Sequence, residues 1–243
     1  MPPKLWLLSI DRLKALASET IFSEAQFFSR SPGSDLLALL TPERRQKVLR
    51  YKPFNDKLRS LGAGLLLSLI LKANSLGSIS LSPSGKPYLT AGGPYFSLSH
   101  SGPYAALLVA NKPCGLDIEM ISERPISPSL SQRVLTEIES ALFEALKRSP
   151  EVFAAIWAIK ESYMKASGLG LRALPDSFSV LPPWPKAKLL FKSYFIARPF
   201  KLPGARAAIS YRLDGPRDFD PGPPLIWRAE PAIIKALKNR PNF

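Results

Sequence analysis

The chain has 243 residues, of which 46% are hydrophobic, and a formal net charge of +14. The hydrophobic content excludes a disordered polypeptide, and a single cysteine excludes an internal disulfide framework, which suits a reducing compartment such as the cytoplasm. The apolar runs 5–10 and 65–71 are far shorter than the roughly 20 residues of a membrane span, and the first lacks a signal-peptide pattern.

In the first half of the chain, the residue pattern predicts helices followed by strands. Thr41 suits the N-cap position of a helix, and Pro42 suits its first helical position. Apolar residues recur at helical spacing over 55–73, so we expect a long core helix that ends near 74–77. The other segments expected here are a buried strand at 4–10, a short helix at 36–40, a turn-rich connection at 82–88, and strands at 95–98 and 104–110.

The second half repeats this order. Thr136 and Glu139 have the spacing of a capping box ahead of a helix at 141–146. A second helix covers residue 152 to about 167 and is closed by Gly168. The other segments expected here are a turn at 111–113, a strand at 115–120, a surface link at 121–131, strands at 177–181, 187–191, 194–197 and 205–211, an irregular segment at 214–224, and a short helix at 231–237.

The first chemically informative stretch is Gly115-Leu116-Asp117-Ile118-Glu119. On a strand, Asp117 and Glu119 point to one face, and two neighbouring carboxylates repel each other unless a cation lies between them. Such oxygen ligands suit Mg²⁺, which commonly takes one or two carboxylates together with substrate phosphates. The alternative is a solvated edge strand whose acids pair with lysines, and an isolated D-x-E pattern favours that alternative.

The second stretch, WAIKESYMK, covers residues 157–165. On a helix, Trp157, Glu161 and Lys165 are successive i,i+4 neighbours on one stripe, and Lys160 lies beside it. The stripe offers a carboxylate, as metal ligand or base, next to ammonium groups that can hold phosphate. The alternative is an ordinary surface ion pair of Glu161 and Lys165, which stabilises a helix by only a few tenths of a kcal/mol.

The third stretch, FSLSHS at 96–101, contains the one histidine of the chain, His100, next to Ser99. Upstream, Lys86 lies in the sequence SGKPY. Hydroxyl, imidazole and ammonium groups together can bind a phosphate. A structural histidine beside capping serines explains the same pattern equally well.

These motifs stand in the order and approximate spacing found in Sfp-type phosphopantetheinyl transferases, which the chain resembles over about residues 41–211. GLDIE and WAIKESYMK carry the resemblance most specifically, and SGKPY, FSLSHS and the PDSFSV of 175–180 support it. The resemblance implies transfer of the 4′-phosphopantetheine arm of coenzyme A to a serine of an acyl or peptidyl carrier protein. The second product would be adenosine 3′,5′-bisphosphate.

The same resemblance implies an α+β fold. Two similar α/β subdomains would be related by a pseudo-twofold axis, with coenzyme A in the cleft between them. The order of helices and strands in each half of the chain agrees with this. We expect an N-terminal subdomain at 1–112, a C-terminal subdomain with the magnesium and catalytic motifs at 113–213, and a C-terminal extension at 214–243.

Matching the motifs position by position implies the site residues. Asp117, Glu119 and Glu161 would hold Mg²⁺, or Mn²⁺, against the coenzyme A pyrophosphate. Glu161 and Lys165 would be catalytic, the first by helping to deprotonate the serine and the second by neutralising charge on the departing half. The residues expected to bind coenzyme A are Arg44, Lys47, Arg59, Ser60, Lys86, Ser99, His100 and Lys160.

The net charge of +14 predicts an acidic partner, which the resemblance makes an acidic apo carrier protein. We expect a cytoplasmic monomer that binds neither nucleic acid nor membrane. Two alternatives remain open. A metal-dependent hydrolase of a nucleotide pyrophosphate would release phosphopantetheine without a carrier. A nucleic-acid-binding module would be retained by DNA or RNA in a salt-sensitive way, although the sequence has no recognition motif for it.

Overall fold

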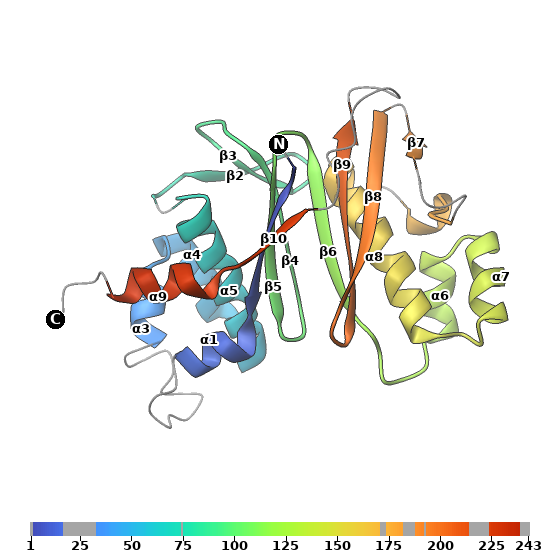
Figure 1. Cartoon of the computed structure of the whole chain (residues 1–243), viewed down its shortest axis with the longest axis horizontal. Helices are drawn as coiled ribbons and strands as arrows, with labels where there is room; N and C mark the ends of the chain where they lie inside the picture. The colour runs from blue at the N-terminus through green and yellow to red at the C-terminus, as the bar shows by residue number, and fades with distance from the viewer. Residues whose placement is uncertain are drawn as a thin grey trace.

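The computed structural model describes residues 2–16, 33–73, 75–170, 174–181, 188–191, 193–213 and 224–238. These segments form four layers, with two β-sheets packed together in the middle and helices on both outer faces (Figure 1). Within them, no helix has the length and apolar character needed to cross a membrane. The first sheet has the strand order β10 (Leu225–Arg228), β1 (Lys4–Ser9), β5 (Tyr104–Ala110), β4 (Tyr95–Ser101).

Helices cover the outer face of this first sheet (Figure 1). The predicted helix start is confirmed, because the Thr41 hydroxyl accepts a hydrogen bond from the backbone N–H of Arg44 at 3.3 Å. The long core helix is also confirmed, but it ends earlier than predicted because Lys72 adopts a left-handed φ of 54°. The helices of this layer are α1 (Ile10–Leu16), α3 (Gly33–Ala38), α4 (Pro42–Arg50), α5 (Phe54–Ile70) and α9 (Glu230–Lys238).

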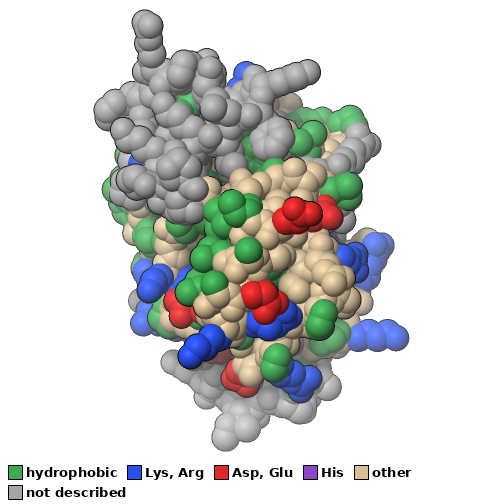
Figure 2. Space-filling view, turned by 90° about the vertical axis from the view of Figure 1, so that its right-hand side faces the viewer, with side chains coloured by type: hydrophobic (Ala, Val, Ile, Leu, Met, Phe, Trp, Pro, Cys, Tyr) green, Lys and Arg blue, Asp and Glu red, His purple; other side chains and the backbone are tan. Residues whose placement is uncertain are grey.

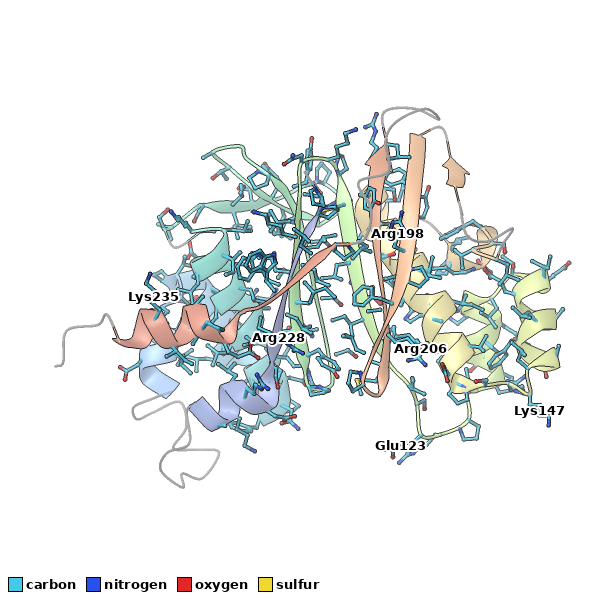
Figure 3. The ribbon with its side chains drawn as sticks, viewed as in Figure 1. Glu123, Lys147, Arg198, Arg206, Arg228 and Lys235 are labelled. Atoms are coloured by element: carbon cyan, nitrogen blue, oxygen red, sulfur yellow. The ribbon has the colours of Figure 1, made fainter. Side chains whose placement is uncertain are left out.

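The second sheet has the order β6 (Cys114–Met120), β9 (Ala205–Leu213), β8 (Ser193–Leu202), β7 (Lys188–Phe191). Its outer face is covered by α6 (Pro128–Val134), α7 (Glu137–Ala145) and α8 (Pro150–Ser167). The capping box of Thr136 and Glu139 is present, and Gly168 ends α8 in a left-handed conformation, both as predicted. Figure 3 shows Arg206 of β9 beside the start of α8, where its guanidinium pairs with Glu151.

The two sheets meet in a third, central core. Side chains from β1, β5, β6 and β9 pack together there, among them Leu7, Leu108, Leu116 and Ile209. Separate cores lie between each sheet and its own helices. Because β4 and β6 are edge strands that lie side by side in this arrangement, the motifs FSLSHS and GLDIE come together although they belong to different sheets (Figure 1).

Three sequence predictions need correction in their bounds or in kind. The turn-rich connection predicted at 82–88 is confirmed at 82–86 as the loop of a hairpin of β2 (Ile79–Leu81) and β3 (Pro87–Leu89), but its last two residues belong to β3. The link at 121–131 contains the start of α6. The strand predicted at 177–181 is absent from this described stretch, which begins with the 3₁₀ turn η2 (Pro175–Ser177) and continues irregularly. Most of the irregular segment predicted at 214–224 lies outside the described residues.

The last described segment returns to the first half of the molecule. Strand β10, which the sequence did not predict, pairs in parallel with β1, and Trp227 stacks on Trp6 at 5.4 Å between ring centroids. Helix α9 follows, and its first residue, Glu230, accepts a hydrogen bond from the backbone N–H of Ser9 at 3.1 Å. Residues 224–238 therefore pack as part of the first sheet and its helix layer.

Candidate active site

A pocket of about 660 Å³ opens between the two halves. Its walls come from α4, α5, the β2–β3 hairpin and β4 on one side, and from β6 and α8 on the other. A volume of this size is typical of sites for small ligands. The ionisable side chains that line it are Glu43, Arg44, Lys47, His100, Asp117, Glu119 and Lys165.

Asp117 and Glu119 lie on β6 and face this pocket together, as the alternation along a strand predicts. The Oδ1 atom of Asp117 accepts hydrogen bonds from Ser99 Oγ at 3.1 Å and from Lys165 Nζ at 2.6 Å. Its Oδ2 atom is buried and has no hydrogen-bond partner in the described part of the chain. Burial and the contact with Asp117 raise the pKa of Glu119 to about 8, against an opposing effect of Lys165.

These two carboxyl groups fit a divalent cation. A buried orphan oxygen and a neighbouring carboxyl group with a raised pKa are what a carboxylate pair shows when no cation balances its charge. Among the described residues, no group of three His, Cys, Asp or Glu side chains has the geometry of a metal site, so the role of Glu161 as a third ligand stays a prediction. Glu161 is half-buried on α8 and interacts electrostatically with Asp117 and Lys165, and burial raises its pKa.

Lys165 reaches the pocket because α8 lies unusually close to β6. A Cβ atom on Gly115 would lie 1.9 Å from the carbonyl oxygen of Ser162 and 3.0 Å from the Cβ of Lys165. Only glycine allows this approach without a shift of the backbone. The glycine of GLDIE therefore allows α8, with its WAIKESYMK motif, to pack directly against β6.

Lys160 lies elsewhere, and its predicted contact with coenzyme A does not fit the geometry. It is completely buried, and its Nζ pairs with the equally buried Glu139 at 2.5 Å. The same atom donates hydrogen bonds to the carbonyl oxygens of Pro175 at 2.6 Å and Phe178 at 2.8 Å. The ammonium group lies in the helical layer, because the side of α8 that carries Lys160 packs against α7 and the segment that begins at η2. Trp157 packs into the core between the second sheet and its helices, and it does not line the pocket among the described residues.

On the α4 side of the pocket, cationic side chains outnumber the one carboxylate, that of Glu43. Arg44 and Lys47 of α4 line the pocket there, and burial lowers the pKa of both side chains. Arg44 donates from one terminal nitrogen to the carbonyl oxygen of Ser60 at 3.1 Å. Its buried Nε has no hydrogen-bond partner among the described residues. Arg44 passes over Gly64, where a Cβ would lie only 3.0 Å from its side chain.

The other residues predicted to bind coenzyme A differ in their positions. Ser60 is buried and does not line the pocket, so its predicted contact does not fit. Arg59 pairs with Asp56 and donates to the carbonyl oxygen of Gly102 at 3.4 Å. Arg59 does not line the main pocket among the described residues, but its positive charge is close enough to lower the pKa of His100.

His100 and Ser99 line the pocket, as expected of a phosphate site. The His100 side chain has an exposed face, yet desolvation by the surrounding protein lowers its pKa, and the positive charges of Arg59, Lys165 and Arg44 lower it further. Ser99 is buried and its hydroxyl already bonds Asp117 and β6.

Lys86 lines a second, smaller pocket of about 230 Å³ rather than the main one. Its Nζ donates to the carbonyl oxygens of Cys114 at 2.9 Å and Ala166 at 3.4 Å. The ammonium group therefore binds backbone of the second half.

Two contributors to this arrangement were not identified from the sequence. Ser97 accepts a hydrogen bond from the backbone N–H of Leu116 at 3.0 Å, and its only sequence signal was the alternation of Ser97 with Ser99. Glu139 was predicted as a capping residue, which it is, but not as the partner of Lys160. Both interactions join segments far apart in the chain, so no local pattern marks them.

Known proteins give a consistent comparison. A model of the 4′-phosphopantetheinyl transferase superfamily matches residues 113–204. A 4′-phosphopantetheinyl transferase of Bacillus subtilis is 32% identical over 153 residues, which cover 60% of this chain and 67% of the relative. The transferase Sfp of Bacillus subtilis strain 168 is 31% identical over 160 residues, covering 63% and 70%. HetI of Nostoc sp., also named a 4′-phosphopantetheinyl transferase, is 29% identical over 202 residues, covering 77% and 81%.

The segment matched by the family model contains Asp117, Glu119, Glu161 and Lys165. Two Bacillus relatives exceed 30% identity over two thirds of their own length. The chain belongs to the 4′-phosphopantetheinyl transferase superfamily.

Proposed function

We propose that the protein transfers the 4′-phosphopantetheine arm of coenzyme A to a serine of an apo acyl or peptidyl carrier protein, with adenosine 3′,5′-bisphosphate as the second product. One observation carries this beyond family membership. The buried Asp117, with an oxygen that has no hydrogen-bond partner among the described residues, and the half-buried Glu119 line one wall of a pocket of about 660 Å³, and Arg44 and Lys47 line the wall formed by α4. A pyrophosphate bound together with a divalent cation satisfies both walls at once.

Asp117 and Glu119 would hold Mg²⁺ or Mn²⁺, with Glu161 as a third ligand or as a neighbour of the site. When bound, the cation would neutralise the negative charge that the pyrophosphate accumulates during transfer. Two protein carboxylates are enough, because Mg²⁺ completes its shell with water and substrate phosphates. The unpartnered Oδ2 of Asp117 supports its role as a ligand.

The protein groups supply the rest of the chemistry. The serine oxygen forms a bond to the phosphorus that carries the pantetheine arm, and the bond from this phosphorus to the bridging oxygen breaks. Glu161 would accept the serine proton, since burial raises its pKa and so makes it a stronger base than an ordinary glutamate. Lys165 would hold the departing phosphate half by its charge.

The cationic wall would bind the rest of coenzyme A. Arg44 and Lys47 face the pocket from α4, and His100 lies at the end of β4 near three positive charges. A 3′-phosphate there would find charge-assisted hydrogen bonds. We assign Arg59 to the margin of this site. Ser60, Lys86 and Lys160 take no direct part, and Ser99 acts on Asp117 rather than on the ligand.

The architecture supports the proposed division into similar subdomains. Each half contains a four-stranded sheet with one helical layer, and β4 and β6 run side by side at the boundary. We propose a pseudo-twofold between the halves and a boundary near 112–113. The third proposed segment, at 214–243, contains β10 and α9, which pack on the first subdomain.

The partner would be an acidic carrier protein. Figure 2 shows Lys and Arg side chains spread over the face formed by the second half, with fewer Asp and Glu among them. With a net charge of +14, such a surface accelerates encounter with an acidic protein without fixing the contact. We propose that the enzyme works as a cytoplasmic monomer without nucleic acid or membrane.

Mass spectrometry tests the proposed function. Several unrelated apo carrier proteins are incubated with the protein, coenzyme A and Mg²⁺, and at least one should gain the mass of one phosphopantetheine. Omission of coenzyme A, or of the protein, is the control. Folded protein that modifies none of the carriers would contradict the proposal, and release of phosphopantetheine without a carrier would favour the hydrolase instead.

A further inference from the structure

The outer edge of β6 is unusual because it lies beside β4 without joining its sheet. Strand β6 pairs with β9 on one side only, and the described strands form two separate sheets on either side of this boundary. Along a strand, the N–H and C=O groups of alternate residues face opposite neighbours. The backbone groups of Cys114, Leu116 and Ile118 therefore face the unpaired edge, although all three residues are buried.

Side chains supply the partners for two of the amide groups on this edge, those of Leu116 and Ile118. Ser97 Oγ accepts from the N–H of Leu116 at 3.0 Å, and Ser99 Oγ accepts from the N–H of Ile118 at 3.2 Å. Ser97 and Ser99 are two residues apart on β4, so their hydroxyl groups share one face and repeat at the same spacing as the amides. A one-residue shift of β6 would break both hydrogen bonds.

Two lysines supply the partners for two of the carbonyl groups, those of Cys114 and Leu116. Lys86 Nζ donates to the oxygen of Cys114 at 2.9 Å, and Lys165 Nζ donates to the oxygen of Leu116 at 3.1 Å. Lys86 comes from the loop of the β2–β3 hairpin and Lys165 from α8. Together with the two serines they replace a missing strand, and we call Lys86, Ser97, Ser99 and Lys165 the side-chain ladder.

The ladder is connected directly to the carboxylates. Ser99 and Lys165 both bind Oδ1 of Asp117, so the side chains that hold the backbone of β6 also orient this carboxylate. The hydrogen bonds of Ser97 and Lys86 go to the backbone of β6 and α8 rather than to Asp117 or Glu119, and among the described residues neither of the two lines the main pocket. Their effect on the site would have to pass through the position of β6.

We propose that Ser97 and Lys86 are positioning residues, which fix the register of β6 against β4 and thereby hold Asp117 and Glu119 opposite Arg44 and Lys47. Only one part of the inference rests on the proposed function, namely the expected effect of these residues on the rate of transfer. The structural part stands by itself, because a buried N–H or C=O group that loses its partner is costly wherever it lies.

Replacing Ser97 by Ala tests the ladder, with three measurements on the full chain. Hydrogen exchange at the Leu116 amide should become about tenfold faster, because its acceptor is gone. Mn²⁺ binding, measured by electron paramagnetic resonance with coenzyme A present, should weaken by about tenfold. The kcat of transfer should fall while KM for the carrier stays unchanged. Ser97→Thr keeps a hydroxyl group on a strand and should restore all three.

Ser131→Ala is the matched control, since Ser131 is also a buried serine, and its hydroxyl group donates a hydrogen bond within α6 to the carbonyl oxygen of Pro128 at 3.0 Å. It should leave Leu116 exchange and Mn²⁺ affinity unchanged. If Ser97→Ala does not fold, Lys86→Met replaces it, with the same expected loss of Mn²⁺ affinity. Ladder variants that match Ser131→Ala in exchange and Mn²⁺ affinity would overturn the inference. Altered exchange and affinity in a protein that modifies no carrier would support the ladder and count against the proposed function alone.

Discussion

Helix α8 holds two lysines five residues apart, and each binds a carboxylate from another element. Lys160 and Glu139 are both 0% exposed, whereas Lys165 is 32% exposed and Asp117 6%. The polar groups of the first pair are bonded to protein, since Glu139 also accepts from the backbone N–H of Thr136 and Val180. In the second pair, one oxygen of Asp117 has no hydrogen-bond partner within the described part of the chain.

This difference separates a structural ion pair from one that we propose to be functional. The Lys160–Glu139 pair joins α7, α8 and the segment after η2, and neither of its side chains is exposed to solvent. The Lys165–Asp117 pair lies on the wall of a pocket beside Glu119, so a ligand can reorganise it. Both lysines belong to the same WAIKESYMK motif, and burial and saturation, rather than residue type, decide which one can take part in chemistry.

The largest expected effect is on stability, from Lys160→Met. Removing one partner of a buried ion pair leaves an uncompensated charge, so the free energy of unfolding should fall by about 3–5 kcal/mol. Urea denaturation followed by circular dichroism measures it. Lys165→Met is the comparison on the same helix and should lower stability by less than Lys160→Met does, because Lys165 is partly solvated whereas Lys160 is not. Equal losses in the two variants would remove the distinction between the pairs.

Asp117→Asn should have the opposite profile. Transfer of phosphopantetheine should fall by about 100-fold or more, because a metal ligand and the partner of Lys165 are lost together. The midpoint of thermal unfolding should not drop, since the repulsion between Asp117 and Glu119 disappears. Steady-state kinetics and calorimetry on the same preparation measure both. Ser131→Ala serves as the control for handling and folding.

Divalent cations should act on the second pair only. With coenzyme A present, Mg²⁺ should raise the unfolding temperature of the wild-type protein by a few °C, because binding to the folded state alone stabilises it. Removing the cation with a chelator should reverse this and stop transfer. In Glu119→Gln the shift should shrink or vanish, whereas a shift as large as in the wild-type protein would remove Glu119 from the site.

The smallest expected effect concerns pH. The pKa of His100 is lowered in the folded protein, so as pH falls through about 6.5 the unfolded chain binds a proton that the folded one does not. Stability from this group is therefore present above that pH and lost below it. A bound phosphate should raise the pKa again. Because the chain has one histidine, a single NMR titration with and without adenosine 3′,5′-bisphosphate measures both effects. An unshifted pKa would separate His100 from the phosphate site.

Local features of the fold could be predicted from the sequence. The N-cap at Thr41, the capping box at Thr136 and the end of α8 at Gly168 depend on residues within a turn or two of each other. Strand β10 could not be predicted in the same way, because four exposed residues pair with β1 near the other end of the chain. The apolar alternation at 177–181 predicted a strand, yet the buried Glu139 and Lys160 hold this segment by its backbone instead.

The candidate site, like the fold, could be predicted only where it depends on local patterns in the sequence. The alternation of a strand places Asp117 and Glu119 on one face, and the helical period places Glu161 and Lys165 on one stripe of α8. Helical spacing cannot tell which side of α8 faces the pocket, so Lys160 was placed with Lys165 although it turns into the core. The contact of Ser97 with β6 depends on how two separate sheets meet, which no local pattern contains.

The most direct test of the central claim compares wild-type protein and Asp117→Asn in one single-turnover reaction. Each is incubated with excess coenzyme A, Mg²⁺ and an apo carrier that the wild-type protein accepts, at equal concentrations of folded protein. The carrier mass should increase by one phosphopantetheine with the wild-type protein and stay unchanged on the same time scale with Asp117→Asn. Conversion at the wild-type rate by Asp117→Asn would contradict the assignment of the pocket carboxylates as the centre of transfer.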